Sequence, residues 1–183
     1  MTTVQDIAND CSAGNVRFHK REESDLFRDA LQAYIESRFS TSANLCATLY
    51  EKIFTTRLVN ETANPSGFVP SKDNLDEQLT NLLNREIEVI ETQKLSFRQI
   101  TSKLVDAGVL THAEKTDYDT FYTTVRNPVA HGLTIRLFEP VLGRAPAHTF
   151  EIDANYEGIF EKTAEELIQK IYELMTVKVL RKQ

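Results

Sequence analysis

Cysteine, glycine and proline are scarce in this sequence, and each shortage excludes a class of protein. The only two cysteines, Cys11 and Cys46, form no CxxC pair and no Cys/His spacing typical of zinc sites. We therefore expect neither a disulfide framework nor a metal centre. Six glycines and five prolines in 183 residues supply few tight turns, which favours long helices over a β protein.

Long apolar runs and cofactor motifs are also missing. No stretch approaches the roughly 20 apolar residues that span a bilayer, and the polar N-terminal residues lack the apolar segment of a signal peptide. The sequence contains no glycine-rich phosphate loop, no dinucleotide fingerprint and no serine-nucleophile motif. We therefore expect a cytoplasmic protein that has no membrane segment and needs no cofactor.

The charge balance limits the kinds of partner. A net charge of -6 argues against a general nucleic-acid coat, whose affinity comes from many cationic contacts with phosphates. It leaves open an enzyme that engages a few phosphates at a local basic site. The densest basic cluster contains Arg17, Lys20 and Arg21 around His19, and it is either a contact for the RNA backbone or a solvated helix start.

Apolar residues recur at helical spacing along most of the chain. Residues 22–59 are interpreted as one long helix, with a kink or restart at the Ser/Thr-rich residues 39–44 as the alternative. Residues 60–74, with two prolines and a glycine, predict a loop, and residues 75–90 predict a further helix. A long amphipathic helix over about residues 155–178 closes the chain.

Two further helices have recognisable ends. Ser96 is expected to begin a helix that stops at Gly108, and Thr111 stands three residues before Glu114, which is capping-box spacing. Residues 133–153 form an insertion whose β-branched and aromatic content predicts a short hairpin or extended segment. Together these patterns predict an all-α fold, a bundle of four to five main helices that forms a single domain over residues 1–183.

The stretch R-N-P-V-A-H, from Arg126 to His131, combines a cation, an amide, a proline and a histidine. Pro128 disfavours helical geometry for Asn127, so the helix that begins near Thr111 is expected to end at about Arg126. Asn127 would then cap a short turn that stops at Gly132. On this interpretation the stretch only separates two structural elements, and His131 is an ordinary surface or core histidine.

The same break supports a chemical interpretation. Residues five apart on an unbroken helix point about 140° apart, and a break after Arg126 would let its guanidinium and the His131 imidazole converge. A fixed cation beside a group that titrates near neutrality suits phosphodiester chemistry, with Asn127 orienting the histidine or holding phosphate. RNA cleavage by the ribose 2′-hydroxyl requires both a base and an acid, and a two-fold dimer would supply two histidines.

This R-x4-H pattern, with a polar residue after the arginine, resembles the HEPN superfamily (higher eukaryotes and prokaryotes nucleotide-binding). Its context agrees, since an early helix carries the acidic "LCATLYEKIF" and a Ser-led helix, "SFRQITSKLVDAGVL", precedes the motif. The resemblance implies a helical, dimeric, metal-independent endoribonuclease with Arg126, Asn127 and His131 as catalytic residues. It also implies that Glu51 contacts Arg126 and fixes its orientation, with Glu36 as the competing candidate or either residue simply solvated.

The resemblance implies RNA as substrate and a role as a toxin or phage-defence effector, with an antitoxin or regulatory protein as partner. Some toxins of the family carry a tyrosine two residues after the histidine, where this chain has Leu133, so neutralisation at that position is not expected. The alternative function is a catalytically silent helical adaptor that binds a protein or nucleotide. In that case Arg126 and His131 would be interface residues.

Overall fold

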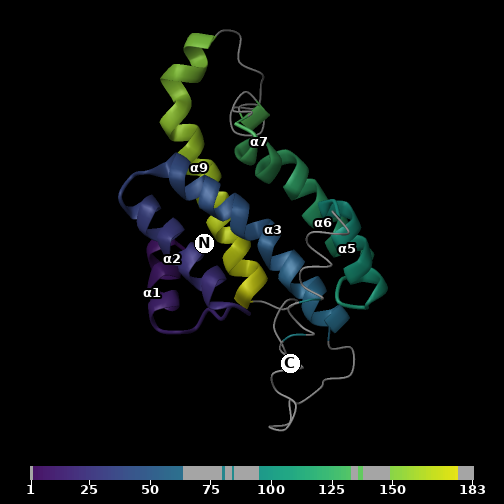
Figure 1. The fold of residues 1–183 in the computed structure, drawn as a ribbon. Helices are drawn as coiled ribbons and strands as arrows, with labels where there is room; N and C mark the ends of the chain where they lie inside the picture. The colour runs from purple at the N-terminus through teal and green to yellow at the C-terminus, as the bar shows by residue number, and fades with distance from the viewer. Residues whose placement is uncertain are drawn as a thin grey trace. The chain divides into compact units, whose positions relative to one another are not determined.

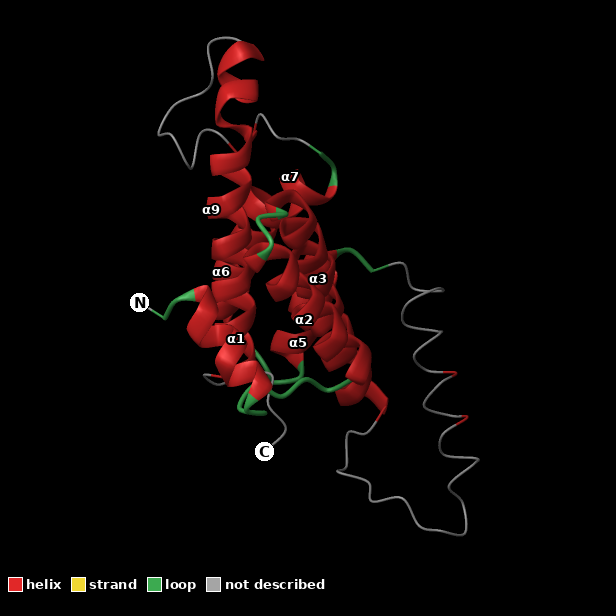
Figure 2. Cartoon of the chain, turned by 90° about the vertical axis from the view of Figure 1, so that its left-hand side faces the viewer, coloured by secondary structure: helices red, strands yellow, loops and turns green. Residues whose placement is uncertain are grey.

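A computed structural model describes residues 2–63, 80, 84, 95–132, 136–137 and 149–176. These residues form helices and loops without a strand (Figure 2), so the all-α prediction is confirmed. No helix among them is both long enough and apolar enough to cross a membrane. The chain divides into a first unit, Met1–Lys52 with Thr120–Gln183, and a second unit, Ile53–Asp119. The assignment of residues 1–183 to one domain stays a prediction.

The first unit begins with α1, Val4–Ser12, which packs on two other helices. Thr3 and Asp6 form a capping box at its start, which satisfies backbone N–H groups that the first turn leaves unbonded. The helix contacts α2 and α9 (Figure 1) and buries Val4 and Ile7. The Tyr172 hydroxyl on α9 donates a 2.5 Å hydrogen bond to Asp10, so one polar contact accompanies the apolar packing of α1 on α9.

Two helices replace the single long helix expected over residues 22–59. α2 covers Arg21–Ile35 and α3 covers Phe39–Ala63. Between them Ser37 takes a φ of 59°, and the Arg38 N–H bonds to the Ala33 carbonyl at 2.8 Å, which closes a Schellman motif. The alternative prediction, a restart at residues 39–44, is confirmed, because α3 begins at Phe39.

The ends of the long helices correct two further boundaries. α3 continues to Ala63, so residues 60–63 of the expected loop are helical, and residues 64–74 lie outside the described part of the chain. α9 covers Thr149–Thr176, so the strand-like conformation expected within residues 133–153 is wrong for 149–153, and residues 136–137 are helical as well. β-propensity is a weak local preference, and an established helix extends by one hydrogen bond for each residue added. The rest of the insertion lies outside the described residues.

The second unit contains the C-terminal half of α3, α5 (Phe97–Asp106) and most of α6 (His112–Phe121). Ser96 and Gln99 form a capping box, and Gly108 ends α5 with a φ of 71°. Thr111 and Glu114 exchange backbone and side-chain hydrogen bonds of 2.8 and 3.2 Å. These three predicted helix ends are confirmed. Of the helix predicted over residues 75–90, only Thr80 and Asn84 are described, and both are helical.

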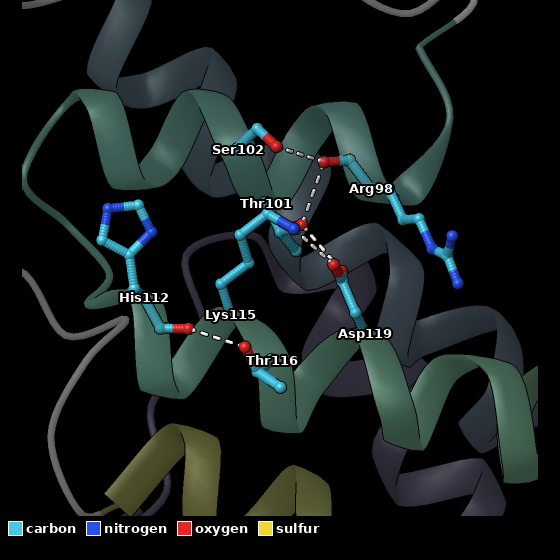
Figure 3. Close-up of polar contacts among 7 residues, drawn as sticks. All are labelled: Arg98, Thr101, Ser102, His112, Lys115, Thr116 and Asp119. Atoms are coloured by element: carbon cyan, nitrogen blue, oxygen red, sulfur yellow. Dashed lines mark hydrogen bonds and ion pairs between the residues drawn. The ribbon is translucent and has the colours of Figure 1, made fainter.

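Aromatic packing and one polar cluster hold α5 and α6 together in this unit. The Phe54 ring contacts those of Phe97 and Tyr118 at centroid distances of 5.0 and 5.2 Å. Figure 3 shows Thr101 and Lys115 converging on Asp119, with a 2.8 Å hydrogen bond from the threonine and a 2.6 Å ion pair with the lysine. We call Thr101, Lys115 and Asp119 the Asp119 cluster.

Candidate active site

The helix that carries the R-N-P-V-A-H stretch does not break at Pro128. α6 runs into η3, a π-helical turn over Tyr122–Arg126, and then into α7, Asn127–Ala130 (Figure 1). Asn127 has φ -66° and ψ -44°, which is ordinary right-handed helix. The predicted end of the helix at Arg126 is therefore wrong.

The π turn explains how the proline is accommodated. In a regular α-helix Pro128 would lack a hydrogen bond, and its ring would clash with the carbonyl four residues earlier. Here the Asn127 N–H bonds to the carbonyl of Tyr122, five residues back, so the turn before the proline holds one residue more than an α turn. This wider turn makes room for the ring without ending the helix.

Because the helix continues, Arg126 and His131 of one chain do not converge through a break. Residues five apart on a continuous helix diverge by about 140°. His131 is exposed at the C-terminal end of α7, and its side chain makes no hydrogen bond or ion pair within the described part of the chain. The predicted convergence of the two side chains through a helix break is therefore not supported.

Arg126 is held by three partners, which we call the Arg126 cradle. Its Nε donates to the Ala47 carbonyl at 3.1 Å, its Nη1 donates to the Tyr122 hydroxyl at 3.0 Å, and its Nη2 forms an ion pair with Glu51 Oε2. The guanidinium carbon also lies 4.8 Å from the centre of the Tyr122 ring, a cation–π contact. Only 13% of the arginine side chain is exposed.

Two of these partners come from one turn of α3. Ala47 and Glu51 are four residues apart and therefore lie on the same face of that helix. The small, buried Ala47 side chain allows the arginine to reach a helix carbonyl, which has a second lone pair to offer. The predicted contact between Glu51 and Arg126 is confirmed. Glu36 instead pairs with Arg38 at 2.6 Å.

The cradle leaves part of the guanidinium uncommitted. Arginine carries five N–H donors in a planar fork, and the cradle engages one on each nitrogen. One N–H on each of the two terminal nitrogens therefore has no partner among the described residues. Burial, followed by the nearby Glu51 charge, raises the pKa of Tyr122 above its ordinary value, so the phenol that accepts from Arg126 is protonated at neutral pH.

The remaining predicted site residues lie apart from the cradle contacts. Asn127 is half-buried, and its carbonyl accepts the His131 N–H at 3.1 Å. Lys20 caps α2, Arg17 is exposed, and the Arg21 side chain is 95% exposed and lies 3.7 Å from Asp25. Arg17 and Arg21 are therefore solvated, as the alternative interpretation stated, whereas Lys20 is half-buried, and RNA contact at these residues stays a prediction.

Sequence reasoning missed Tyr122 and the Ala47 carbonyl. No role at the site was predicted for Tyr122, although its position four residues before Arg126 is the spacing at which helix side chains meet. The carbonyl carries no sequence signal, because every residue has one. No match was found among models of known protein families, curated proteins or solved structures. The described residues contain no group of three His, Cys, Asp or Glu side chains placed to bind a metal.

Proposed function

We propose that this chain is a metal-independent endoribonuclease of the HEPN type, with a site shared by two protomers. The observation that supports it best is the Arg126 cradle, in which a largely buried cation is fixed by Glu51, Ala47 and Tyr122. Two of its N–H groups stay available for an anion. A donor fixed before the reaction stabilises developing charge without the cost of reorganisation.

The proposed reaction is attack of a ribose 2′-hydroxyl on the adjacent phosphorus. A His131 imidazole takes the hydroxyl proton as the 2′-oxygen bonds to phosphorus, and a second His131 gives a proton to the departing 5′-oxygen. The products are a 2′,3′-cyclic phosphate and a 5′-hydroxyl. Arg126 stabilises the extra negative charge on the non-bridging oxygens, and Asn127 orients the histidine or the phosphate.

The continuous motif helix makes the dimer a requirement of this mechanism. Each chain supplies one motif histidine, His131, which lies five residues from Arg126 on a continuous helical path. A two-fold axis near α7 would place two copies of the motif opposite one another and supply both the acid and the base. Sedimentation can test this step, because a monomer that still cleaves RNA at micromolar concentration would contradict the shared site.

We propose the cytoplasm as the location, cellular or invading RNA as substrate, and a toxin or phage-defence role. An antitoxin or regulatory protein would then be the partner that restrains the enzyme. The acidic surface, with a net charge of -6, gives little general attraction to RNA. Affinity is therefore expected to depend on few contacts, with the Arg17, Lys20 and Arg21 side chains as the candidates outside the motif.

The decisive experiment measures RNA cleavage in excess EDTA by wild type, Arg126→Ala and His131→Ala. Arg28→Ala and His112→Ala are the matched controls, because both residues are exposed and lie outside the motif. Cleavage by wild type and both controls, with 2′,3′-cyclic phosphate ends and no cut at a 2′-deoxy linkage, supports the proposal. Equal behaviour of all five proteins would overturn it.

The burial of Arg126 favours a second candidate function. An arginine that is only 13% exposed, with every nitrogen engaged, also suits a purely structural anchor in a silent helical adaptor. In that case Arg126→Ala would lower the free energy of unfolding, and His131→Ala would leave it unchanged. Neither substitution would affect RNA cleavage. An adaptor would also show no cleavage of any RNA by wild type, so one experiment separates the two candidates.

A further inference from the structure

Tyr122 contributes two different contacts to the Arg126 cradle. Its hydroxyl accepts the Nη1 hydrogen bond at 3.0 Å, and its ring lies 4.8 Å from the guanidinium carbon. The other two cradle partners, the Ala47 carbonyl and Glu51, both belong to α3. Tyr122 is thus the one cradle partner on the arginine's own helical path, four residues earlier in the π turn.

A third partner matters because two contacts on α3 do not fix a flexible side chain in one orientation. An arginine side chain has about 2 kcal/mol of rotamer entropy to lose, and an anchor at Nε together with one at Nη2 leaves the Nη1 end of the fork unsupported. The Tyr122 hydroxyl anchors that end. The three contacts therefore set the plane of the guanidinium and the direction of its two uncommitted N–H groups.

We infer that Tyr122 is a positioning residue that holds the Arg126 guanidinium in the orientation in which it receives phosphate. The inference rests on the proposed function, because the phosphate is the anion of that reaction. Tyr122 acts through Arg126. Its removal should therefore weaken stabilisation of the transition state more than binding of the substrate, which lowers kcat and leaves KM nearly unchanged.

The first test does not depend on ribonuclease activity. In protein labelled with 15N, the Nε–H resonance of Arg126 is identified by its loss in Arg126→Lys, and its exchange with water is measured. We expect exchange in Tyr122→Phe to be about five times faster than in wild type, because one anchor of the fork is lost. Tyr156→Phe is the matched control, since Tyr156 is exposed on α9 and stacks on Phe160, and it should leave the exchange unchanged.

The second test is kinetic. Tyr122→Phe keeps the ring and should lower kcat about tenfold, and Tyr122→Leu removes ring and hydroxyl and should lower it further, to about 50-fold. KM and the midpoint of thermal unfolding should change little in Tyr122→Phe, whereas a purely structural tyrosine would lower the midpoint and spare kcat. Tyr156→Phe should match wild type.

The outcomes separate this inference from the proposed function. Unchanged Arg126 exchange in Tyr122→Phe overturns the inference, whether or not the protein cleaves RNA. Faster exchange with an unchanged kcat also overturns it, because the arginine would then not need the tyrosine for the reaction. If Tyr122→Phe gives faster exchange and the wild-type protein cleaves no RNA, the proposed ribonuclease function is overturned. That result would still show that Tyr122 orients the Arg126 guanidinium.

Discussion

Two polar clusters in this protein each contain a carboxylate, a cation and a hydroxyl group, but a different ion lies at the centre of each. In the Asp119 cluster a carboxylate is the central group, and it receives Lys115 from its own helix and Thr101 from α5. In the Arg126 cradle a cation is the central group, and it receives an acid, a carbonyl and a phenol. The central side chain is 13% exposed in both.

The identity of the central ion decides what each cluster can do. An enclosed carboxylate with a cation and a hydroxyl donor attracts no further anion, so the Asp119 cluster serves to join α5 to α6. An enclosed arginine uses a planar fork of donors, and it keeps some of them for a second anion. Similar packing can therefore build a structural cross-link in one place and a candidate phosphate site in another.

Removal of the two cations gives the largest expected contrast. Arg126→Ala should lower the RNA cleavage rate about 1,000-fold, because a fixed donor at the transition state is lost. It should also lower the free energy of unfolding by about 2 kcal/mol, because the partly buried ion pair with Glu51 is lost. Lys115→Ala should change the cleavage rate less than twofold. Initial cleavage rates and urea unfolding of both variants test this prediction. Equal cleavage rates in Arg126→Ala and Lys115→Ala would contradict the distinction between a phosphate site and a structural cluster.

Neutralising the two carboxylates should give a smaller contrast. Glu51→Gln keeps an acceptor for Arg126 and removes the charge, so cleavage should fall about tenfold, the cost of one weakened charge-assisted bond. Asp119→Asn should leave the cleavage rate of the folded protein unchanged. The same initial-rate assay decides, and a larger loss in Asp119→Asn than in Glu51→Gln would reverse the assignment of the two clusters.

Thr101→Val should affect stability alone. The threonine is fully buried and donates to Asp119, and its loss leaves a carboxylate oxygen without that donor. A decrease of about 1–2 kcal/mol in the free energy of unfolding is expected, the usual effect of losing one partner in a buried bond. Ser102→Ala on the neighbouring exposed position is the control and should change this value little. A cleavage defect in folded Thr101→Val would show that the cluster is more than a cross-link.

The smallest expected effect is a pH dependence in α1, away from both clusters. Hydrogen bonds from Tyr172 and then Asn15 lower the pKa of Asp10, and the bond to Asp10 followed by burial raises that of Tyr172. The stabilisation from the Tyr172–Asp10 hydrogen bond is therefore fully present between about pH 4 and pH 10. It is lost as pH falls through the lowered Asp10 pKa or rises through the raised Tyr172 pKa.

Hydrogen exchange of the α1 amides between pH 3 and pH 6, corrected for intrinsic rates, measures the acid side of this window. Protection should fall toward pH 3 in wild type and should change less with pH in Tyr172→Phe. An identical profile in the two proteins would mean that the Thr3–Asp6 capping box, where the Asp6 pKa is also lowered, accounts for the dependence.

Local signals in the sequence predicted local features well. Ser96 and Thr111 begin their helices as expected because a capping box needs only residues three positions apart. The break near Ser37 was predicted only as the alternative, a restart at residues 39–44, and the π turn before Pro128 was missed, since it is a backbone arrangement that several residue types tolerate. Pro128 predicted a helix end because proline disfavours helical geometry in the residue before it, yet Asn127 is helical and the wider turn gives the proline ring room.

One contact of the candidate site was predicted from the sequence, and its other contacts were not. The resemblance implied the Glu51–Arg126 pair, which spans 75 positions of sequence and is present in the structure. The Ala47 carbonyl belongs to the backbone and carries no sequence signal, and a tyrosine at helical spacing among apolar residues, such as Tyr122, does not stand out as a site residue. Non-local backbone contacts of this kind depend on how two helices approach, which one sequence does not specify.

The π turn at Tyr122–Arg126 also bears on how this motif tolerates insertions and deletions. A π turn holds one residue more than an α turn, so loss of Thr123 or Thr124 would convert this turn to regular α-helix. In a regular helix the Pro128 ring would clash with the carbonyl four residues before it. A chain shortened by one residue here is therefore expected to lose the helical path through Arg126 and Asn127, although its composition would change little. The length of this segment is thus as much a part of the motif as the identity of its residues.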